Sequence, residues 1–334
     1  MISGPRAELE QIEQGIRRVE LTIGVDVGGT KIAAGVVDAD GRILERLRVP
    51  TPESVDDIDA GISEAVEKLR QTEAGGRVAA VGVAAAGFVN EHRTAVRFAP
   101  NIAWREHPLA GIVSKRVQLP VVVENDANAA AWAEYRFGAG RDVTDVVTVT
   151  VGTGVGGGIV LDGTLLRGAF GMAAEIGHMR VVPNGRACGC GQTGCWEQYA
   201  SGRALARSAF ELAIRDPKAA GPLIEAAGGK IDGLVGSMIT EVALAGDPAA
   251  IGLFAELGRW LGEGVAALAN VLDPAVVVIG GGVAEVGDLL LEPARKAFTT
   301  HLSAGANRPH LQLRAAEMGN DAGIIGAADL ARNR

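Results

Sequence analysis

All three cysteines of the 334-residue chain lie within eight positions, a spacing typical of a metal site. They are Cys188, Cys190 and Cys195, and His178 lies ten residues before the first of them. Three thiolates and one imidazole complete a tetrahedral zinc site, and four protein ligands indicate a structural ion rather than a catalytic one. The alternative is a group of buried cysteines without a metal. We expect a structural zinc that holds the loop of residues 175–197 rigid.

Two carboxylates flank the cysteine cluster. Glu175 lies three residues before His178, so one helical turn would place both side chains on the same side. Glu197 lies two residues after Cys195. Zinc would therefore fix two carboxylates in space, an arrangement suited to charge-assisted hydrogen bonds with vicinal hydroxyl groups.

A further acidic residue, Asp126, follows a short apolar strand at residues 120–123 and opens a helix expected from 127 to about 137. Asp126 and its neighbour Asn125 are ordinary helix N-caps, which is the structural interpretation. The carboxyl end of a strand is also where α/β proteins place catalytic groups. A carboxylate there could accept a proton from a substrate hydroxyl, and the helix N-terminus would keep it ionised.

Two glycine-rich turns suit phosphate binding. Gly28-Gly29-Thr30-Lys31 forms the expected tip of a hairpin, where backbone N–H groups, a hydroxyl and an ammonium could hold phosphate, although an ordinary turn is an equal alternative. Gly152-Thr153-Gly154 begins a G-x-G-x-x-G match. The residues after it indicate a strand, whereas the dinucleotide fingerprint needs a helix, so a second glycine-tipped hairpin fits better. The sequence also lacks a P-loop motif.

A third glycine run, Gly280-Gly281-Gly282, follows a buried strand. Glycines there permit the close approach of a flat group such as adenine, or tight packing between a strand and a helix. Both explanations are open from the residues alone.

Apolar periodicity predicts alternating strands and helices around these groups. A strand, a glycine turn and a second strand occur near the start and recur about 125 residues later, which indicates two related halves. The order favours an α/β architecture with mixed sheets. The expected strands are residues 21–27, 32–37, 78–83, 120–123, 147–151, 158–161 and 276–279, and the expected helices are 54–71 with Ser54 as N-cap, 127–137, and one from near 321.

Composition narrows the class of protein. The chain is 48% hydrophobic with a net charge of −8, and its basic residues form no stripe that would suit nucleic acid. It shows neither an apolar run long enough for a membrane span nor the apolar core of a signal peptide. An odd number of clustered cysteines argues against a disulfide framework. We therefore expect a cytoplasmic protein without nucleic-acid or membrane partners.

Taken in order, these motifs resemble the ROK family of bacterial sugar kinases and, within it, the ATP-dependent glucokinases of actinobacteria. The resemblance runs from about Leu21 to the C-terminus. It rests on the segments Asp26–Lys31, Glu124–Ala130, Gly152–Gly158, Glu175–His178 and Cys188–Glu197.

The resemblance implies a two-domain α/β fold of the actin-like ATPase (ribonuclease H-like) type with an active-site cleft between the domains. It implies an N-terminal extension at 1–20, a small domain at 21–130 plus 320–334, and a large domain with the zinc loop at 131–319. Asp126 would be the catalytic base, acting on the 6-hydroxyl of glucose. The residues that would contact the sugar are Gly87, Asn101, Asn125, Asp126, Glu175, His178 and Glu197. The residues that would hold the nucleotide are Gly28, Gly29, Thr30, Lys31, Gly152, Thr153, Gly154, Gly280, Gly281 and Gly282.

The implied cofactors are ATP, Mg²⁺ and a structural Zn²⁺ on His178, Cys188, Cys190 and Cys195, and the implied assembly is a homo-oligomer, a dimer or tetramer. Three alternatives stay open. The chain could phosphorylate another hexose, such as fructose, mannose or an N-acetylhexosamine, or use polyphosphate as donor. It could be a sugar-sensing transcriptional regulator, although the short, non-basic segment before Leu21 disfavours a DNA-binding module. A zinc-knuckle binding module fits the length and the two hairpins less well.

Overall fold

The computed structural model describes residues 21–333 in two compact units. Within this range, unit 1 consists of residues 21–129 and 323–333, and unit 2 of residues 130–322. The expected N-terminal extension, residues 1–20, lies outside the described residues.

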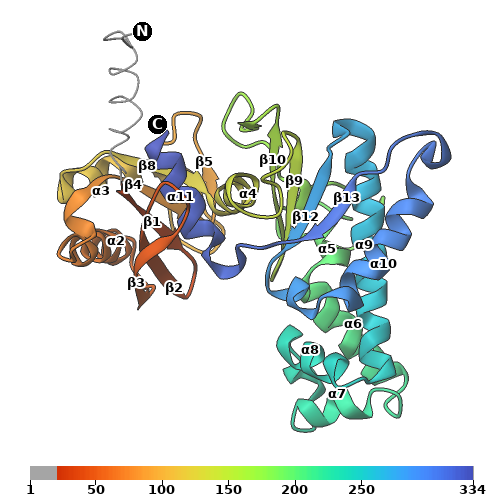
Figure 1. Ribbon diagram of the computed structural model, residues 1–334. Coiled ribbons are helices and arrows are strands. Elements are labelled where there is room, and N and C mark those ends of the chain that lie inside the picture. Colours follow the sequence, from red (N-terminus) through yellow and green to blue (C-terminus); the bar gives the residue numbers. More distant parts are fainter. Residues whose placement is uncertain (1–20, 334) are drawn as a thin grey trace. The chain divides into compact units, whose positions relative to one another are not determined.

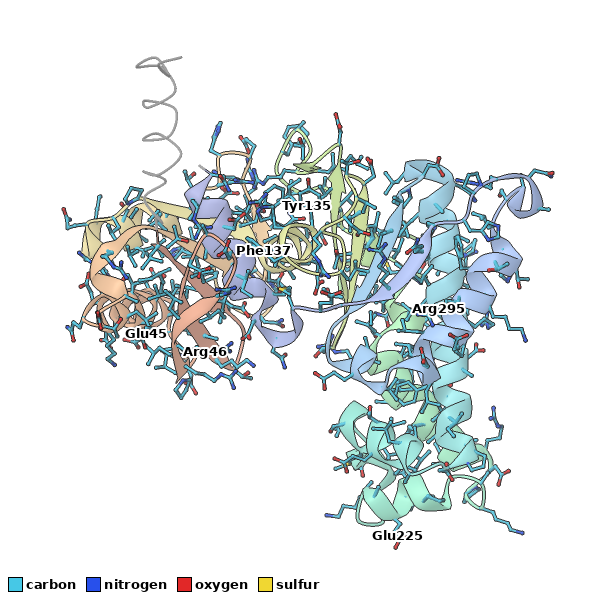
Figure 2. All side chains as sticks on the ribbon, in the orientation of Figure 1. Glu45, Arg46, Tyr135, Phe137, Glu225 and Arg295 are labelled. Atoms are coloured by element: carbon cyan, nitrogen blue, oxygen red, sulfur yellow. The ribbon has the colours of Figure 1, made fainter. Side chains whose placement is uncertain are left out.

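Unit 1 is built on a five-stranded mixed sheet in the order β3-β2-β1-β4-β8. The first three strands pair antiparallel, whereas β4 and β8 run parallel to β1. Glu45 and Arg46 are neighbours on the edge strand β3, so they point to opposite faces of the sheet (Figure 2). The strands are β1 (Leu21–Val27), β2 (Lys31–Val37), β3 (Ile43–Pro50), β4 (Val78–Ala85) and β8 (Val121–Asn125).

Three of the four helices of unit 1, α2, α4 and α11, begin close to where the sequence predicts, whereas α3 was not predicted. Ser54 caps α2 by accepting a hydrogen bond from the backbone N–H of Asp57 at 3.2 Å. A small antiparallel sheet is inserted between β4 and β8. The helices are α2 (Val55–Arg70), α3 (Leu109–Val117), α4 (Asp126–Arg136, continuing into unit 2) and α11 (Ala322–Arg332), and the small sheet consists of β5 (Phe88–Val89), β6 (Val96–Phe98) and β7 (Arg105–His107).

Helix α11 lies directly on the sheet of unit 1 because the strands carry glycine where it crosses. A Cβ added at Gly24 would lie 1.8 Å from the carbonyl oxygen of Ile324. A Cβ at Gly82 would lie equally close, at 1.8 Å, to that of Ala327. These two glycines therefore set the distance between helix and sheet.

Unit 2 has a sheet with the same order and strand directions, β11-β10-β9-β12-β13. The repeated topology confirms the two related halves that the recurring strand–turn–strand pattern predicts. Strand β10 starts earlier than the predicted Gly158, because Val155, Gly156 and Gly157 also belong to the strand. The strands are β9 (Val146–Val151), β10 (Val155–Leu161), β11 (Thr164–Leu165), β12 (Val276–Gly280) and β13 (Gln312–Ala315).

Six α-helices of unit 2 follow β11 and pack on one core that the sequence patterns did not predict. Helices α9 and α10 lie side by side (Figure 1), and a Cβ at Gly262 would lie 2.2 Å from the carbonyl oxygen of Ala294. In the described range no single helix is long and apolar enough to cross a membrane; α8 with α9, bent by 117°, passes that test by length and composition. The helices are α5 (Glu197–Ala200), α6 (Gly202–Arg215), α7 (Gly221–Ala226), α8 (Gly236–Leu244), α9 (Pro248–Leu272) and α10 (Asp288–His301).

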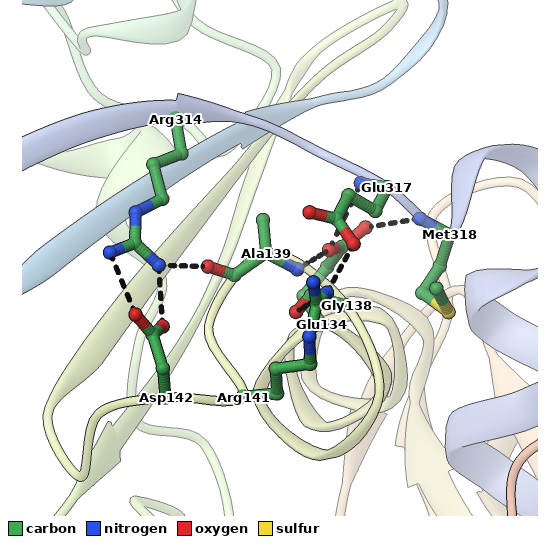
Figure 3. Close-up of polar contacts among 8 residues, drawn as sticks. All are labelled: Glu134, Gly138, Ala139, Arg141, Asp142, Arg314, Glu317 and Met318. Carbon is green, nitrogen blue, oxygen red and sulfur yellow. Dashed lines mark hydrogen bonds and ion pairs between the residues drawn. The ribbon is translucent and has the colours of Figure 1, made fainter.

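A buried carboxylate ties the first helix of unit 2 to its last segment. Glu134 is 2% exposed, and its Oε2 accepts hydrogen bonds from the backbone N–H groups of Ala139 at 3.0 Å and Glu317 at 3.1 Å (Figure 3). Its Oε1 accepts a third from Met318 at 2.8 Å. Arg314 reinforces the contact by donating to the carbonyl oxygen of Ala139 at 2.7 Å. Residues 134–139 and 314–318 are therefore held together.

Candidate active site

Asp126 lies where β8 ends and α4 begins, as the sequence predicts. Its Oδ1 accepts hydrogen bonds from the backbone N–H of Ala127 at 2.9 Å and from Nδ2 of Asn125 at 3.1 Å. Burial raises the pKa of Asp126, and these hydrogen bonds oppose the rise. The result is an oriented carboxylate with a stronger affinity for a proton, which suits a general base.

Asn125 has the capping role that its residue type predicts. Its Oδ1 accepts a hydrogen bond from the backbone N–H of Asn128 at 3.0 Å, and its Nδ2 also donates to the carbonyl oxygen of Gly87 at 3.2 Å. Gly87, Asn125 and Asp126 therefore lie together at the carboxyl ends of β4 and β8. Their contact with a sugar stays a prediction.

Glu124, which the sequence analysis did not single out, stabilises the junction of β8 and α4 by hydrogen bonds. It is 1% exposed, and its Oε1 accepts from the backbone N–H of Asn125 at 3.0 Å and from Nδ2 of Asn128 at 3.2 Å. Its Oε2 lies 3.1 Å from Nε of Arg93. The ion pair compensates a buried charge, so the segment before Asp126 is fixed by side chains as well as by the sheet.

Asp26 is the second residue of unit 1 that was missed. Burial, and then the charge of Asp126, raise its pKa to about 6, while Lys31 acts in the opposite direction. A Cβ at Gly323 would lie 2.9 Å from Cγ of Asp26, so glycine makes room for this carboxylate. The signal in the sequence was an acidic residue inside an apolar strand, directly before a glycine turn.

The first glycine turn is anchored by Thr51. Its backbone N–H donates to the carbonyl oxygen of Thr30 at 3.1 Å, and its hydroxyl donates to that of Gly28 at 2.7 Å. A Cβ at Gly29 would lie 3.8 Å from Cβ of Asn101, so this turn and Asn101 are neighbours. Lys31, the first residue of β2, carries a positive charge that attracts the carboxylate of Asp26 and lowers its pKa. Unit 1 thus gathers the expected phosphate turn, Asn101 and two carboxylates.

The cysteine cluster of unit 2 has the dimensions of a zinc site. One ligand atom from each of His178, Cys188, Cys190 and Cys195 lies within 4.8 Å of all the others. Cys190 Sγ lies 3.6 Å from Cys195 Sγ, and Cys188 Sγ lies 3.7 Å from Nδ1 of His178. Zn–S bonds of about 2.3 Å and Zn–N bonds of about 2.0 Å place tetrahedral ligand atoms about 3.5 to 3.8 Å apart. The donor set therefore fits zinc.

Glu197 joins the cysteine cluster to the second glycine turn. Its Oε1 lies 3.0 Å from Sγ of Cys188. A Cβ at Gly154 would lie 2.6 Å from its Oε2, so this carboxylate lies against the turn. Unit 2 therefore brings a carboxylate expected to bind sugar, an expected metal ligand and an expected phosphate turn to one place.

Glu175 is held by a backbone conformation that is unusual for its neighbour. Ala174 has φ of +68°, a left-handed conformation that costs about 1 kcal/mol or more outside glycine. A Cβ at Gly177 would lie 2.0 Å from the carbonyl oxygen of Val155, so the 3₁₀ turn Ile176–His178 packs tightly on β10. The strain and the packing fix the direction of the segment between Glu175 and His178.

A cavity of about 730 Å³ in unit 2 contains parts of two predicted glycine turns. Gly152 and Thr153 lie on its wall together with Gly282. Gly280 and Gly281 have packing roles instead, because a Cβ at Gly281 would lie 2.5 Å from the carbonyl oxygen of Val151 and one at Gly280 would lie 2.8 Å from Cβ of Ala316. Tight packing therefore explains Gly280 and Gly281, whereas the approach of a flat group to Gly282 stays a prediction.

The rest of this cavity was not predicted. One wall comes from the start of α6 with Arg203, and another from the segment that leads into α8, with Leu234 and Val235. Val235 is 47% exposed, so its side chain is open to a ligand in the cavity. Polar side chains of α8 and Glu285 complete the lining. A pocket of this volume, lined by both apolar and polar side chains, suits a small organic ligand.

The family model for ROK proteins matches residues 22–334, and the chain belongs to this family. Its fold is the α/β fold of the actin-like ATPase type that ROK sugar kinases share, as the resemblance implied.

Individual relatives agree with this class. The chain is 53% identical over 312 residues to a glucokinase of Streptomyces coelicolor, which covers 93% of this chain and 98% of the relative. A crystal structure of a ROK family glucokinase from Streptomyces griseus in complex with glucose and AMPPNP is 54% identical, with a TM-score of 0.86 and coverage of 94% of this chain and 100% of the other. An N-acetylmannosamine kinase of Escherichia fergusonii is 37% identical and covers 93% of this chain and 98% of the relative.

Proposed function

We propose that this protein transfers the γ-phosphoryl group of ATP to the 6-hydroxyl of glucose, giving glucose 6-phosphate and ADP. The observation that carries the proposal is the carboxylate of Asp126, oriented by Ala127 N–H and Asn125 Nδ2 at the end of β8. The choice of glucose and ATP is supported by the 53% identity with the Streptomyces coelicolor glucokinase.

Asp126 accepts the proton of the attacking hydroxyl. Its raised pKa increases the basicity of the carboxylate, and general-base catalysis contributes about 10²- to 10⁴-fold. Phosphoryl transfer passes through a loose transition state, so holding the hydroxyl and the phosphoryl group in line supplies most of the remaining acceleration.

The proposal names sugar-binding residues in each unit. Gly87, Asn101 and Asn125 contribute from unit 1, and Glu175, His178 and Glu197 from unit 2. Zinc on His178, Cys188, Cys190 and Cys195 cross-links the loop. Nδ1 of His178 faces Cys188, which leaves Nε2 for a sugar hydroxyl, so the metal and the substrate use different nitrogens of one ring.

The nucleotide is proposed to occupy the 730 Å³ cavity of unit 2, with its phosphates toward Gly152, Thr153 and Gly154. The Gly28–Lys31 turn of unit 1 is proposed as a second phosphate-binding turn. Magnesium prefers oxygen ligands and keeps several waters. Asp26 offers a carboxylate beside the first glycine turn and would hold the magnesium of MgATP, which would neutralise phosphate charge.

We also propose units 1 and 2 as the small and large domains of the kinase. All three cysteines are free, which suits the reducing cytoplasm. The homo-oligomer that the family resemblance implies stays a prediction, and light scattering on the purified protein would measure its size.

A coupled ADP-release assay with MgATP and a panel of hexoses tests the proposal. The panel contains glucose, fructose, mannose and N-acetylmannosamine, and polyphosphate replaces ATP in a parallel series. We expect turnover with glucose and ATP that falls by about 10²-fold or more in Asp126→Asn, while the fold and the bound zinc are kept. A near-normal rate in Asp126→Asn would refute the base, and a higher kcat/KM for another hexose would refute the choice of glucose.

A further inference from the structure

A second cavity of unit 2, of about 610 Å³, lies between α6, α9 and the loop of residues 175–197, which we call the cysteine loop. We name it the arginine pocket, because Arg186, Arg207 and Arg215 line it. None of its lining residues is a candidate for catalysis, for sugar binding or for the metal. Its volume is within the range of small-molecule sites.

The acidic residues of the arginine pocket are already paired. Both carboxylate oxygens of Glu211 accept hydrogen bonds from Nη2 of Arg186, at 2.9 and 3.2 Å. Glu256 accepts from Nε of Arg259, which lies outside the lining, at 2.9 Å. These carboxylates therefore leave little negative charge for other cations.

Arg207 and Arg215 form no ion pair or hydrogen bond with a carboxylate within residues 21–333, although Glu211 attracts the charge of Arg207 electrostatically. Arg207 donates from Nη2 to the carbonyl oxygen of Gln198, while its buried Nε has no hydrogen-bond partner in this range. Burial, and then the nearby Arg186, lower the pKa of Arg207, so a bound anion would stabilise its charged form. Arg207, Glu211 and Arg215 are spaced four residues apart on α6, on one face of the helix.

The remaining wall suits an organic ligand with hydrogen-bond acceptors. Tyr199 and Trp260 present rings whose centroids are 4.6 Å apart, and Leu253 and Leu257 add apolar surface from α9. Ser208 and the phenol of Tyr199 supply hydroxyl groups. Paired guanidinium groups recognise phosphate by parallel hydrogen bonds.

We propose that the arginine pocket binds a small metabolite that carries a phosphate group, with Arg207 and Arg215 as its anchors. The ligand would contact the loop that holds the expected zinc and Glu197. The hydroxyl of Tyr199 accepts a hydrogen bond from the backbone N–H of Arg186 at 2.9 Å, two residues before Cys188. Gln198, whose carbonyl oxygen binds Arg207, follows Glu197 directly. Occupancy therefore changes the affinity for the sugar, a consequence that rests on the proposed function.

Isothermal titration calorimetry on the full chain tests the binding. Ribose 5-phosphate is titrated into protein already saturated with glucose and AMPPNP, so that the candidate active site is filled. We expect saturable binding that weakens about tenfold or more in Arg207→Gln and in Arg215→Gln. Lys218→Gln removes an exposed charge just beyond α6 and outside the lining, and should leave the affinity unchanged.

Arg215→Gln is the decisive variant, because Arg215 makes no polar contact within the described chain and its loss should leave the fold intact. Absence of binding to the native protein, or equal affinity in Arg215→Gln and Lys218→Gln, would overturn the proposal. Tighter binding of citrate than of ribose 5-phosphate would overturn the choice of phosphate. The readout is binding rather than turnover, so a failure here and a failure to phosphorylate glucose are separate results.

Discussion

The two five-stranded sheets share one topology but carry different chemistry at equivalent positions. In unit 1 the next-to-last residue of the first strand is Asp26, whereas the same place in β9 of unit 2 is Thr150. The first glycine turn therefore follows a buried carboxylate, and the second follows a hydroxyl. A repeated scaffold fixes where the chain turns, but single residues near the turn decide which half carries charge.

The units also differ in how their helices reach the core. In unit 1 the strands supply the glycines, so α11 lies directly on the sheet at Gly24 and Gly82. In unit 2 the helices supply them, so α9 meets α10 at Gly258 and Gly262. Close approach can thus be built into either partner of a packed pair, and it depends on the missing Cβ in both.

The largest expected effect comes from closing that space in unit 1. Gly82→Ala would force a Cβ to within 1.8 Å of a backbone oxygen that cannot move without the helix, so we expect a loss of about 3 kcal/mol or more in the free energy of unfolding. Urea unfolding measures it. Gly111→Ala, in α3 with no atom within 4 Å, is the control and should raise stability by about 0.5–1 kcal/mol. Equal effects of the two would contradict the packing argument.

The variant Asp26→Asn tests whether the buried carboxylate distinguishes β1 from β9, which carries Thr150 at the same place. The pKa of Asp26 is about 6 in the folded protein against 3.8 ordinarily, so the folded state binds this proton more tightly than the unfolded one. Its contribution to stability is full below about pH 4 and is lost as the pH rises through 6, for a total of about 2 to 3 kcal/mol.

We therefore expect Asp26→Asn to have a higher Tm than the native protein at pH 7.5 and an equal Tm near pH 4, with lower turnover. Thermal scans across this pH range give the measurement. Thr150→Val, at the equivalent place in β9, provides the matched control and should show no such pH dependence. A Tm difference that stays constant with pH would show that ionisation of Asp26 is not its cause.

Removal of one expected zinc ligand tests whether the cysteine loop serves the sugar. Because Glu197 lies against Cys188, we expect Cys190→Ala to raise the KM for glucose by about tenfold while the KM for ATP changes less. Steady-state kinetics and metal analysis of the same preparation measure both. An unchanged glucose KM in protein that has lost its zinc would separate the loop from the sugar site.

The last expected effect lies within one helix of unit 2. Gly262→Ala places a Cβ 2.2 Å from Ala294 O and should destabilise the protein by about 2 kcal/mol. Gly252→Ala in the same helix meets no atom within 4 Å and should stabilise it by about 0.5–1 kcal/mol. Opposite signs in thermal unfolding would support the packing of α9 on α10, and matching signs would contradict it.

Local signals predicted the parts of the fold that are set by neighbours along the chain. Ser54 capped its helix, and the alternating residues of β1 and β9 formed strands as expected. Helices α5 to α10 escaped prediction because their apolar faces are set by packing on one another. Helix α9, for example, carries glycines where helix propensity disfavours them, and only contact with α10 explains Gly258 and Gly262.

The candidate site was predicted as far as residue type and spacing reach. The four residues of the cysteine cluster come together with the spacing of a metal site. The support of Asp126 by Glu124 and Arg93, and the raised pKa of Asp26, depend on contacts between distant segments and on burial. The spacing of residues along the sequence predicts neither these contacts nor this burial.

The hydrogen bonds of the Glu134 carboxylate bear on how unit 2 is connected to unit 1 along the chain. It fastens the entry of unit 2 to its exit, so the two ends of residues 130–322 are neighbours. A segment whose ends adjoin can be nested within another without stretching its host, and here unit 2 lies in the chain between the completed sheet of unit 1 and α11, the helix that packs on that sheet. Glu134 thus holds the two ends of unit 2 together. A short linker would be enough to join these ends if unit 2 were produced as a separate protein.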